Sequence, residues 1–219
     1  MHLAIILDGN RRFTNKLAMQ PWKGHEFGAK TVEKLLDWCK ELDIKELTLY
    51  ALSIENLKRD KQELDYLFKL MKKEFEKFKT DKRIKEDEIK IRFPGKLSLL
   101  PEDLQKLCKE IEENTENNEN YKINFCLAYG GRQELIEAFN KIKDEKEITE
   151  QDISNNLWLK DEPNIIIRTG NQMRTSNFLP WQSIYSEWFF LEKLWPEFTK
   201  QDLQEVLEQF KQRQRNFGK

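Results

Sequence analysis

Leu3-Ala4-Ile5-Ile6-Leu7, followed directly by Asp8-Gly9-Asn10-Arg11-Arg12, places an apolar run in front of a carboxylate, a glycine, an amide and two guanidinium groups. The run has the length of a buried strand, and ligands of open α/β sheets bind beyond the carboxyl ends of the strands. A carboxylate there can hold Mg²⁺, and adjacent arginines can donate paired hydrogen bonds to phosphate oxygens. The stretch therefore predicts a site for a phosphorylated ligand with Mg²⁺. Taken alone, it is more simply explained as a strand-to-helix turn.

The composition restricts the class of protein. The chain has 219 residues, and we expect residues 1–219 to form one domain. Charged residues make up 35% but nearly cancel, to a net charge of −1, which argues against a partner made of nucleic acid. Three scattered cysteines predict reduced core thiols of a cytosolic protein. No apolar run has the length of a membrane span and no signal peptide precedes the first strand, so membrane contact is expected to be peripheral at most.

Helical and strand patterns alternate along the chain. Apolar residues recur at helical spacing over 25–42, over 61–79 and after Pro101. Thr199 and Asp202 match the capping box that starts a last helix. The alternation predicts an α/β fold, in which a single domain has a central, mostly parallel sheet of about six strands flanked by helices. Strands are expected at 3–7, 46–52, 89–93, 121–127, 164–167 and 188–191.

Polar residues gather in the loops that follow four of these strands. In a parallel sheet such loops share one rim, which would hold several arginines around at least one carboxylate. Each residue alone has a plainer explanation, such as a surface ion pair or a helix cap. Their coincidence in four loops favours a site for a diphosphate with a metal ion. The residues are Asp8 to Arg12, then Ser53, Glu55, Asn56, Arg59 and Glu63, then Tyr129 to Arg132, then Arg168, Arg174, Thr175, Ser176 and Asn177.

Several other phosphate and hydrolase sites are excluded by pattern. The chain has no GxxxxGK[ST] or GxGxxG loop, no GxSxG elbow, no HExxH helix and no DDxxD helix of the trans-type prenyl synthases. An unrelated Mg²⁺ phosphohydrolase with Asp8 as its nucleophile remains an alternative. Such an enzyme would typically have a second aspartate where this chain has Asn10.

Together the four loops resemble one family, the cis-prenyltransferases, and within it the bacterial undecaprenyl diphosphate synthases. The resemblance covers almost the whole chain, with the motifs in order and at the family's spacing. The matching segments are Asp8–Phe13, Gly24–Gly28, Leu47–Arg59, Tyr129–Arg132, Ile167–Gln182, Tyr185 with Glu187, and Trp195–Phe198.

The resemblance implies a reaction. An allylic diphosphate, typically farnesyl diphosphate, is elongated by isopentenyl diphosphate units with cis double bonds, and diphosphate is released. The product is a long polyprenyl diphosphate such as undecaprenyl diphosphate, a lipid carrier for cell-wall synthesis. In the family, an aspartate matching Asp8 works with Mg²⁺, which also involves a glutamate matching Glu187.

The resemblance also assigns substrate contacts. The resemblance implies that Asn56, like Asp8, is a catalytic residue. Because an amide is a poor base, we expect Asn56 to orient the substrate while a diphosphate oxygen accepts the proton. The apolar residues from Leu64 to Phe78 are candidates for a product tunnel, although plain core is the simpler explanation. The allylic diphosphate is held by the residues matching Gly9, Asn10, Arg11, Arg12, Phe13 and His25. Isopentenyl diphosphate is held by those matching Arg168, Arg174, Thr175 and Ser176, and a flexible loop matches Ser53, Ile54, Glu55, Asn56, Leu57 and Arg59.

Four positions depart from the family pattern. Pro21 stands where an arginine is usual, with Lys23 nearby, so one phosphate contact is lost or replaced. Leu57 replaces an aromatic residue, Asp60 a proline and Gln172 a glutamate. These changes are expected to affect loop mobility and turnover rate.

The family forms homodimers, and the aromatic-rich stretch Trp181–Trp195 corresponds to its dimer region. We therefore expect a homodimer in the cytoplasm, in transient contact with the inner face of the membrane when the apolar product leaves. An alternative of another class is a non-catalytic accessory subunit of a cis-prenyltransferase complex. Such subunits typically lose the first-loop aspartate, which this chain keeps as Asp8.

Overall fold

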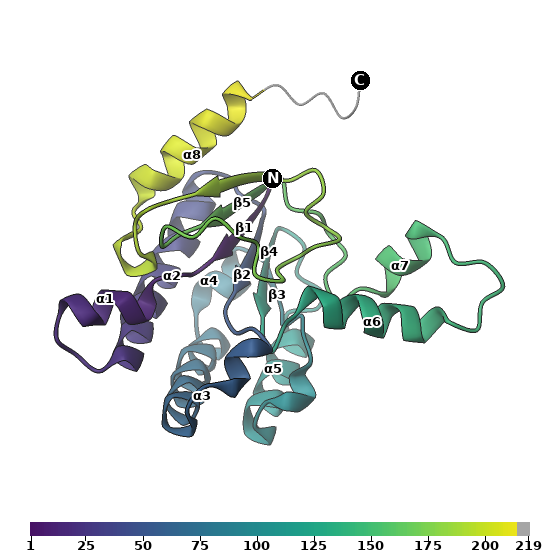
Figure 1. Cartoon of the computed structure of the whole chain (residues 1–219), viewed down its shortest axis with the longest axis horizontal. Coiled ribbons are helices and arrows are strands. Elements are labelled where there is room, and N and C mark those ends of the chain that lie inside the picture. Colours follow the sequence, from purple (N-terminus) through teal and green to yellow (C-terminus); the bar gives the residue numbers. More distant parts are fainter. Residues whose placement is uncertain (214–219) are drawn as a thin grey trace.

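Six parallel strands form one sheet in the computed structural model, which describes residues 1–213 (Figure 1). Their order across the sheet is β3-β4-β2-β1-β5-β6, and every neighbouring pair is parallel. The expected α/β fold and its strand count are therefore confirmed. The strands are β1 His2–Ile6, β2 Glu46–Tyr50, β3 Ile89–Arg92, β4 Tyr121–Cys126, β5 Ile165–Arg168 and β6 Glu187–Phe190.

Helices lie in each connection between successive strands except that from β5 to β6, and they pack against the sheet. The α-helices of the described chain are α1 Asn10–Lys16, α2 Gly24–Glu41, α3 Lys61–Glu76, α4 Lys82–Glu86, α5 Glu102–Asn114, α6 Gly131–Ile142, α7 Glu150–Asn156 and α8 Lys200–Gln212. Short 3₁₀ helices lie at Pro21–Lys23, Glu55–Lys58, Lys77–Lys79, Leu97–Leu99 and Trp195–Glu197. As Figure 1 shows, α6 and α7 project from the body of the domain as an arm.

The prediction of a helix over 61–79 is wrong for the last turn. The α-helix ends at Glu76, and Lys77–Lys79 continue as a 3₁₀ turn. The short helices α1, α4 and α7 have only five to seven residues, too few for apolar periodicity to mark them. The capping box at Thr199 and Asp202 is confirmed at the start of α8.

The two faces of the sheet carry different layers. Leu3 and Ile5 of β1 point into the larger core, where α2, α3, α5 and α8 pack. Ala4 and Ile6 point to the other face, because successive strand residues alternate. That face packs against Leu159, Phe178 and Leu179 of the long segment between α7 and β6. The three cysteines are buried and unpaired, in agreement with core thiols.

The strand order changes direction at β1. The chain passes from β1 to β2 on one side, and β5 later pairs with the other side of β1. The crevice beyond the carboxyl end of such a strand is where ligands of open parallel sheets bind. The segments that follow β1, β2, β4 and β5 meet at this rim. Over residues 1–213, no helix combines the length and the apolar character needed to cross a membrane.

Candidate active site

Asp8 lies directly beyond the carboxyl end of β1 and is held by guanidinium groups. Its Oδ1 accepts a hydrogen bond from Nη2 of Arg12 at 3.1 Å, and its Oδ2 accepts one from Nη2 of Arg168 at 2.9 Å. Its backbone carbonyl accepts from Oγ1 of Thr169 at 2.8 Å and from the backbone N–H of Trp195 at 3.0 Å. Two distant segments of the chain, at Arg168–Thr169 and at Trp195, therefore fix Asp8 together with the neighbouring Arg12.

Glycines shape the turns that follow β1 and β5, and Gly170 allows Arg12 to come this close. Gly9 has a φ of 115°, a conformation that residues with a Cβ rarely adopt. Gly170 has a φ of 85°, and a Cβ there would lie 2.4 Å from Nη2 of Arg12. Arg12 is thus held between the loops that follow β1 and β5.

A second cluster surrounds the buried carboxylate of Glu63, at the start of α3. Glu63 accepts a hydrogen bond from Nη1 of Arg59 at 3.1 Å, and Nη1 of Arg11 lies 3.9 Å from its other oxygen. Nε2 of His25 is 3.9 Å from Glu63 and makes no hydrogen bond, although it is buried. Burial, with the charges of Arg59 and Arg11, lowers the pKa of His25 to about 4.

The sequence places Glu63 on the expected rim, but the family resemblance gives it no role. Its spacing of four residues from Arg59 is compatible with an ion pair, and the structure forms that pair although Arg59 precedes the helix. Its burial, with 5% of the residue exposed, could not be expected for a carboxylate so close to a helix start. Glu63 holds two of the cations that point into the rim.

The segment after β2 is tied to the rim by reciprocal hydrogen bonds. The backbone N–H of Ser53 donates to Oδ1 of Asn56 at 3.3 Å, and the backbone N–H of Asn56 donates to Oγ of Ser53 at 3.1 Å. Glu55 accepts a hydrogen bond from Nδ2 of Asn177 at 3.0 Å. Ile54 and Leu57 pack against the larger core, so their side chains anchor this turn.

Arg168 forms the centre of a third cluster. Its side chain is only 4% exposed, and Nη1 donates to Oγ of Ser176 at 2.7 Å and to the carbonyl of Arg174. Its Nε is buried and has no hydrogen-bond partner. Arg174 is exposed and donates to Oε1 of Gln172 at 2.5 Å. Thr175 is exposed and does not line the cavity described next.

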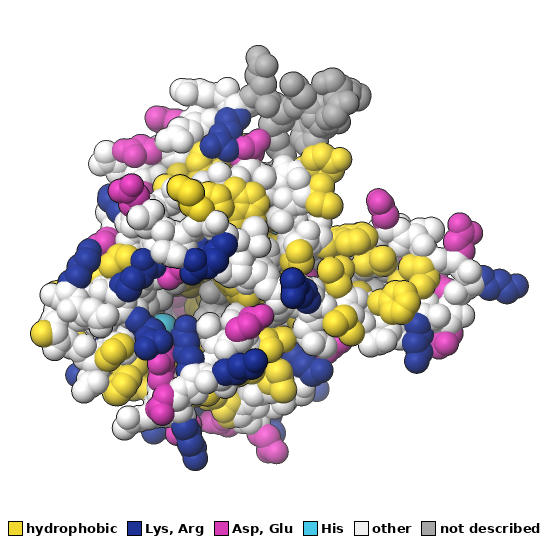
Figure 2. Space-filling view, viewed as in Figure 1, with side chains coloured by type: hydrophobic (Ala, Val, Ile, Leu, Met, Phe, Trp, Pro, Cys, Tyr) yellow, Lys and Arg dark blue, Asp and Glu magenta, His cyan; other side chains and the backbone are white. Residues whose placement is uncertain are grey.

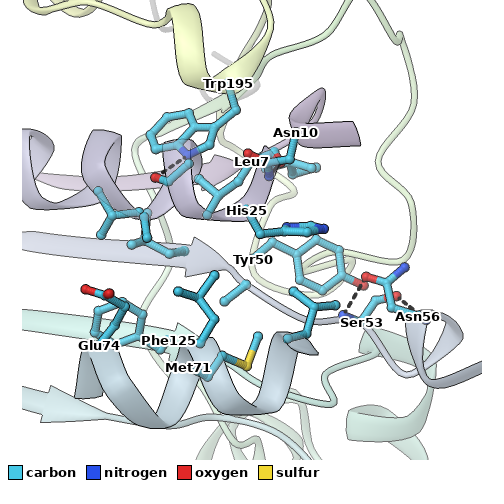
Figure 3. Close-up of a pocket in the computed structure, with 18 of the residues that line it drawn as sticks. Leu7, Asn10, His25, Tyr50, Ser53, Asn56, Met71, Glu74, Phe125 and Trp195 are labelled. Atoms are coloured by element: carbon cyan, nitrogen blue, oxygen red, sulfur yellow. Dashed lines mark hydrogen bonds between the residues drawn. The ribbon is translucent and has the colours of Figure 1, made fainter. Parts of the chain in front are cut away.

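One cavity of about 770 Å³ joins these clusters to an apolar interior. Asp8, His25, Asn56, Arg168 and Arg174 line its polar mouth, around which Lys and Arg side chains gather in Figure 2. Figure 3 shows the cavity passing from Ser53 and Asn56, beyond β2, toward Met71, Phe125 and Glu74. Its apolar lining includes Val32, Leu36, Leu67, Leu70, Met71, Phe75, Phe78 and Phe125.

Comparison with known proteins agrees with this geometry. Residues 6–218 match the model of the family described as "Putative undecaprenyl diphosphate synthase". A tritrans,polycis-undecaprenyl-diphosphate synthase (geranylgeranyl-diphosphate specific) of Thermococcus kodakarensis is 42% identical over 229 residues, covering 100% of this chain and 86% of the relative. An enzyme of the same description from Archaeoglobus fulgidus is 43% identical over 213 residues, 92% of this chain and 85% of the relative.

Solved structures give the same result. A probable undecaprenyl diphosphate synthase from Campylobacter jejuni superposes with a TM-score of 0.85 at 33% identity, over 100% of this chain and 98% of the other. Lavandulyl diphosphate synthase from Lavandula x intermedia, in complex with dimethylallyl diphosphate, superposes with a TM-score of 0.92 at 30% identity and the same coverage. The chain belongs to the cis-prenyltransferase family.

Not every residue expected at the site of this cis-prenyltransferase lies there. Glu187 is the first residue of β6 and pairs with Ile165, whereas Phe190 at the other end of β6 pairs with Arg168. Glu187 therefore lies near the amino ends of the strands, level with Leu3, whereas Asp8 follows their carboxyl ends; Glu187 alone is about 10 Å back along the strand direction from Phe190. Its side chain is paired with Arg213, at the end of α8. The expected pairing of Asp8 and Glu187 around one metal ion is not formed within a single chain.

The mouth of the cavity has the chemistry of a diphosphate site. Nε2 of His25, Nε of Arg168 and Oδ1 of Asn10 are buried there without hydrogen-bond partners, and buried polar atoms rarely stay unpaired. The described residues contain no cluster of three or more His, Cys, Asp or Glu side chains suited to a metal ion. Mg²⁺ commonly binds through one carboxylate together with substrate phosphates, so Asp8 with a bound diphosphate fits that ion.

Proposed function

We propose that this cis-prenyltransferase adds isopentenyl diphosphate units, with cis double bonds, to an allylic diphosphate and releases diphosphate. The observation that carries the proposal is the continuous cavity between the arginine-rich rim at Asp8 and the apolar space beside α3. A diphosphate head and a hydrocarbon tail require such an arrangement. The product is a long polyprenyl diphosphate, and undecaprenyl diphosphate is the one that the relatives' names support.

The names of the archaeal relatives favour a longer primer than the expected farnesyl diphosphate. They describe synthases specific for geranylgeranyl diphosphate. We therefore propose geranylgeranyl diphosphate as the allylic substrate of this chain. A preference for farnesyl diphosphate in the assay below would restore the original expectation.

Two diphosphate positions are assigned to the two sides of Asp8. The allylic diphosphate would contact the loop from Gly9 to Phe13 and the unpaired Nε2 of His25. Isopentenyl diphosphate would contact Arg168, Arg174 and Ser176, with Thr175 as backbone support because its side chain lies outside the cavity. The arginines neutralise the diphosphates through charge-assisted hydrogen bonds.

Asp8 is proposed to hold Mg²⁺ together with a substrate diphosphate. The ion would neutralise the charge of the leaving diphosphate. Both oxygens of Asp8 accept hydrogen bonds from Arg12 and Arg168. Diphosphates that draw these two arginines away would free the carboxylate for the ion.

Asn56 is proposed to orient the reacting end of isopentenyl diphosphate. Its Oδ1 is turned to the backbone of Ser53, which leaves the Nδ2 amide as a donor toward the cavity that it lines. An amide does not accept a proton at neutral pH, so a diphosphate oxygen is the proposed acceptor.

A single assay tests the proposed reaction. The protein is incubated with labelled isopentenyl diphosphate, Mg²⁺ and either geranylgeranyl or farnesyl diphosphate, and the product is sized. We expect Mg²⁺-dependent long-chain product and a higher kcat/KM for geranylgeranyl diphosphate. The absence of product with both primers would instead favour the non-catalytic accessory subunit.

We also propose a homodimer that works in the cytoplasm and contacts a membrane transiently. Ile136 and Phe139 of α6 are 55% and 51% exposed, and Ile184 is 70% exposed. In Figure 2, hydrophobic side chains gather over the arm of α6 and α7. Exposed apolar clusters of this kind are typical of protein interfaces. The apolar product is proposed to leave toward a bilayer.

A further inference from the structure

The motif Tyr129–Arg132, which follows β4 and enters α6, has no role in the proposed binding of either diphosphate. The backbone N–H of Ile54 donates a hydrogen bond to the carbonyl of Tyr129 at 2.9 Å, and the N–H of Tyr129 donates to the carbonyl of Leu52 at 3.1 Å. These hydrogen bonds join the motif to the segment that follows β2. The motif is therefore held in place at the rim of the sheet.

Asn177, in the segment that follows β5, packs against this motif. Its carbonyl accepts a hydrogen bond from the backbone N–H of Gly131 at 2.8 Å, and its Oδ1 accepts one from the backbone N–H of Arg132 at 2.9 Å. A Cβ on Gly130 would lie 2.9 Å from Nδ2 of Asn177, so the glycine makes room for the amide. Asn177 has a φ of 63°, a left-handed conformation in which asparagine is enriched.

The other side-chain atom of Asn177 reaches a third loop. Its Nδ2 donates to Oε1 of Glu55 at 3.0 Å, across 122 positions of the chain. Glu55 directly precedes Asn56, which is proposed to orient the reacting end of isopentenyl diphosphate. On the other side, Asn177 directly follows Ser176, which accepts a hydrogen bond from Arg168 at 2.7 Å in the proposed diphosphate position. One amide thus lies between the groups assigned to the two ends of this substrate.

We propose that Asn177 is a positioning residue for isopentenyl diphosphate, acting through Glu55 and Ser176. The inference rests on the proposed function, because it uses the positions assigned there to the two ends of the substrate. One loop would hold the diphosphate and another the reacting end, so the two ends are aligned only while the loops keep a fixed separation. A misplacement of about 1 Å at the reacting atoms can slow a reaction a hundredfold.

A purely structural role is the alternative that the experiment must separate. Gly130, at the start of α6, has no side chain to cap the helix, and Oδ1 of Asn177 accepts from one of its first N–H groups. Asn177→Asp keeps an acceptor for that N–H group, and a negative charge is favourable at a helix N-terminus. The variant loses the donor to Glu55 and places two carboxylates face to face. It therefore breaks the link between the loops and preserves the cap.

Asn177→Asp should impair the use of isopentenyl diphosphate alone. We expect kcat/KM for isopentenyl diphosphate to fall about tenfold, because the reacting end is no longer aligned, with little change in KM for the primer or in melting temperature. Glu55→Ala breaks the same link from the other side, without touching α6, and should give a similar loss. Asn171→Asp is the matched control: it lies in the same loop with a φ of 53° but does not line the cavity.

Restoring the hydrogen bond in the opposite direction should restore the activity. In Asn177→Asp combined with Glu55→Gln, the new amide can donate to the new carboxylate, and we expect most of the lost kcat/KM to return. Asn177→Asp combined with Glu55→Ala has the same charge but no such hydrogen bond, so it should stay impaired. This pair separates the lost link from simple repulsion between the new carboxylate and the diphosphate.

Steady-state kinetics for both substrates and thermal unfolding decide the result. Wild-type kinetics in Asn177→Asp, equal recovery in the two double variants, or no recovery in either would overturn the positioning role. A lower melting temperature with unchanged kinetics would leave Asn177 as a helix cap only and would also overturn it. If Asn177→Asp does not fold, wild-type kinetics in Glu55→Ala would refute the link. A wild type that forms no product would overturn the proposed function instead.

Discussion

Asp8 is positioned by residues that are far from it in sequence. The chain pattern could place Asp8, Arg12 and Arg168 at strand ends, and the structure brings all three within hydrogen-bonding distance. The direct pair of Asp8 and Arg168 could not be predicted, because 160 residues separate them and only the order of the strands puts β5 beside β1.

Asp8→Ala should abolish turnover and leave the fold intact. We expect kcat to fall more than tenfold at saturating Mg²⁺, a loss above about 1.4 kcal/mol of transition-state stabilisation, while the melting temperature changes little. Arg12 and Arg168 lose their carboxylate partner and remain available for diphosphate. Steady-state kinetics checks this, with Asp103→Ala as the control carboxylate outside the cavity. More than a tenth of the wild-type kcat in Asp8→Ala would contradict the proposed metal role.

Arg174→Ala should weaken the binding of isopentenyl diphosphate selectively. Arg174 is exposed at the mouth. Its side chain donates a hydrogen bond to Gln172, and its backbone carbonyl accepts one from Arg168, so truncation of the side chain leaves Asp8 in place. We expect KM for isopentenyl diphosphate to rise about tenfold, the effect of one charge-assisted hydrogen bond, with KM for the primer unchanged. Arg92→Ala is the control on the outer strand β3. Equal increases for both substrates would mean that the two positions are assigned wrongly.

His25 should make the stability of the fold depend on pH. Its pKa of about 4 in the folded chain lies below its ordinary value of 6.5, because it is buried beside Arg59 and Arg11. As the pH falls from 6.5 to 4, the unfolded chain takes up a proton that the folded chain does not, so stability is lost, by up to roughly 3 kcal/mol. Denaturant unfolding at several pH values should show a smaller loss for His25→Asn. Identical pH profiles for both proteins would argue against a buried neutral His25.

At the scale of elements, long periodic segments were predictable and short ones were not. The apolar face of α3 predicted that helix, but nothing in the pattern marked the change to a 3₁₀ turn at Lys77. The helices α4 and α7 are held by their caps, Asp81 and Thr149, rather than by a long apolar face. The contact between α1 and α2 depends on glycines of α2, whose role becomes visible only when the helices are packed.

Gly28→Ala should push these two helices apart. A Cβ on Gly28 would lie 2.2 Å from Oδ1 of Asn10 and 3.0 Å from Cδ1 of Trp195. Although alanine favours a helix, crowding of this kind typically costs about 1–3 kcal/mol. We expect a lower melting temperature and a higher KM for the allylic substrate, because Asn10 belongs to the loop assigned to it. Lys30→Ala, on the same helix, is the control. A Gly28→Ala variant as stable and active as the wild type would show that the helices adapt.

At the scale of the molecule, the parallel sheet and its ligand-binding rim followed from the alternation of elements. What covers each face of the sheet could not be predicted in the same way. The second face is covered by the segment around Leu159, Phe178 and Leu179, which has little regular structure. The position of Glu187 near the amino ends of the strands could not be predicted either, since a motif gives the order of residues along the chain but not the end of the strand at which they lie.

The proposed dimer provides the last prediction. Ile136 and Phe139 lie three residues apart on α6, so they share one helical face, and both are more than half exposed. In a monomer, this face would leave apolar surface in water; in a dimer, it would be buried at roughly 25 cal/mol per Å². The variant Ile136→Ser with Phe139→Ser should therefore sediment as a monomer at micromolar concentration, whereas the wild type sediments as a dimer. Leu99→Ser removes a similarly exposed side chain from another surface and should leave the dimer intact. A monomeric wild type would refute the dimer, and a dimeric double variant would place the interface elsewhere.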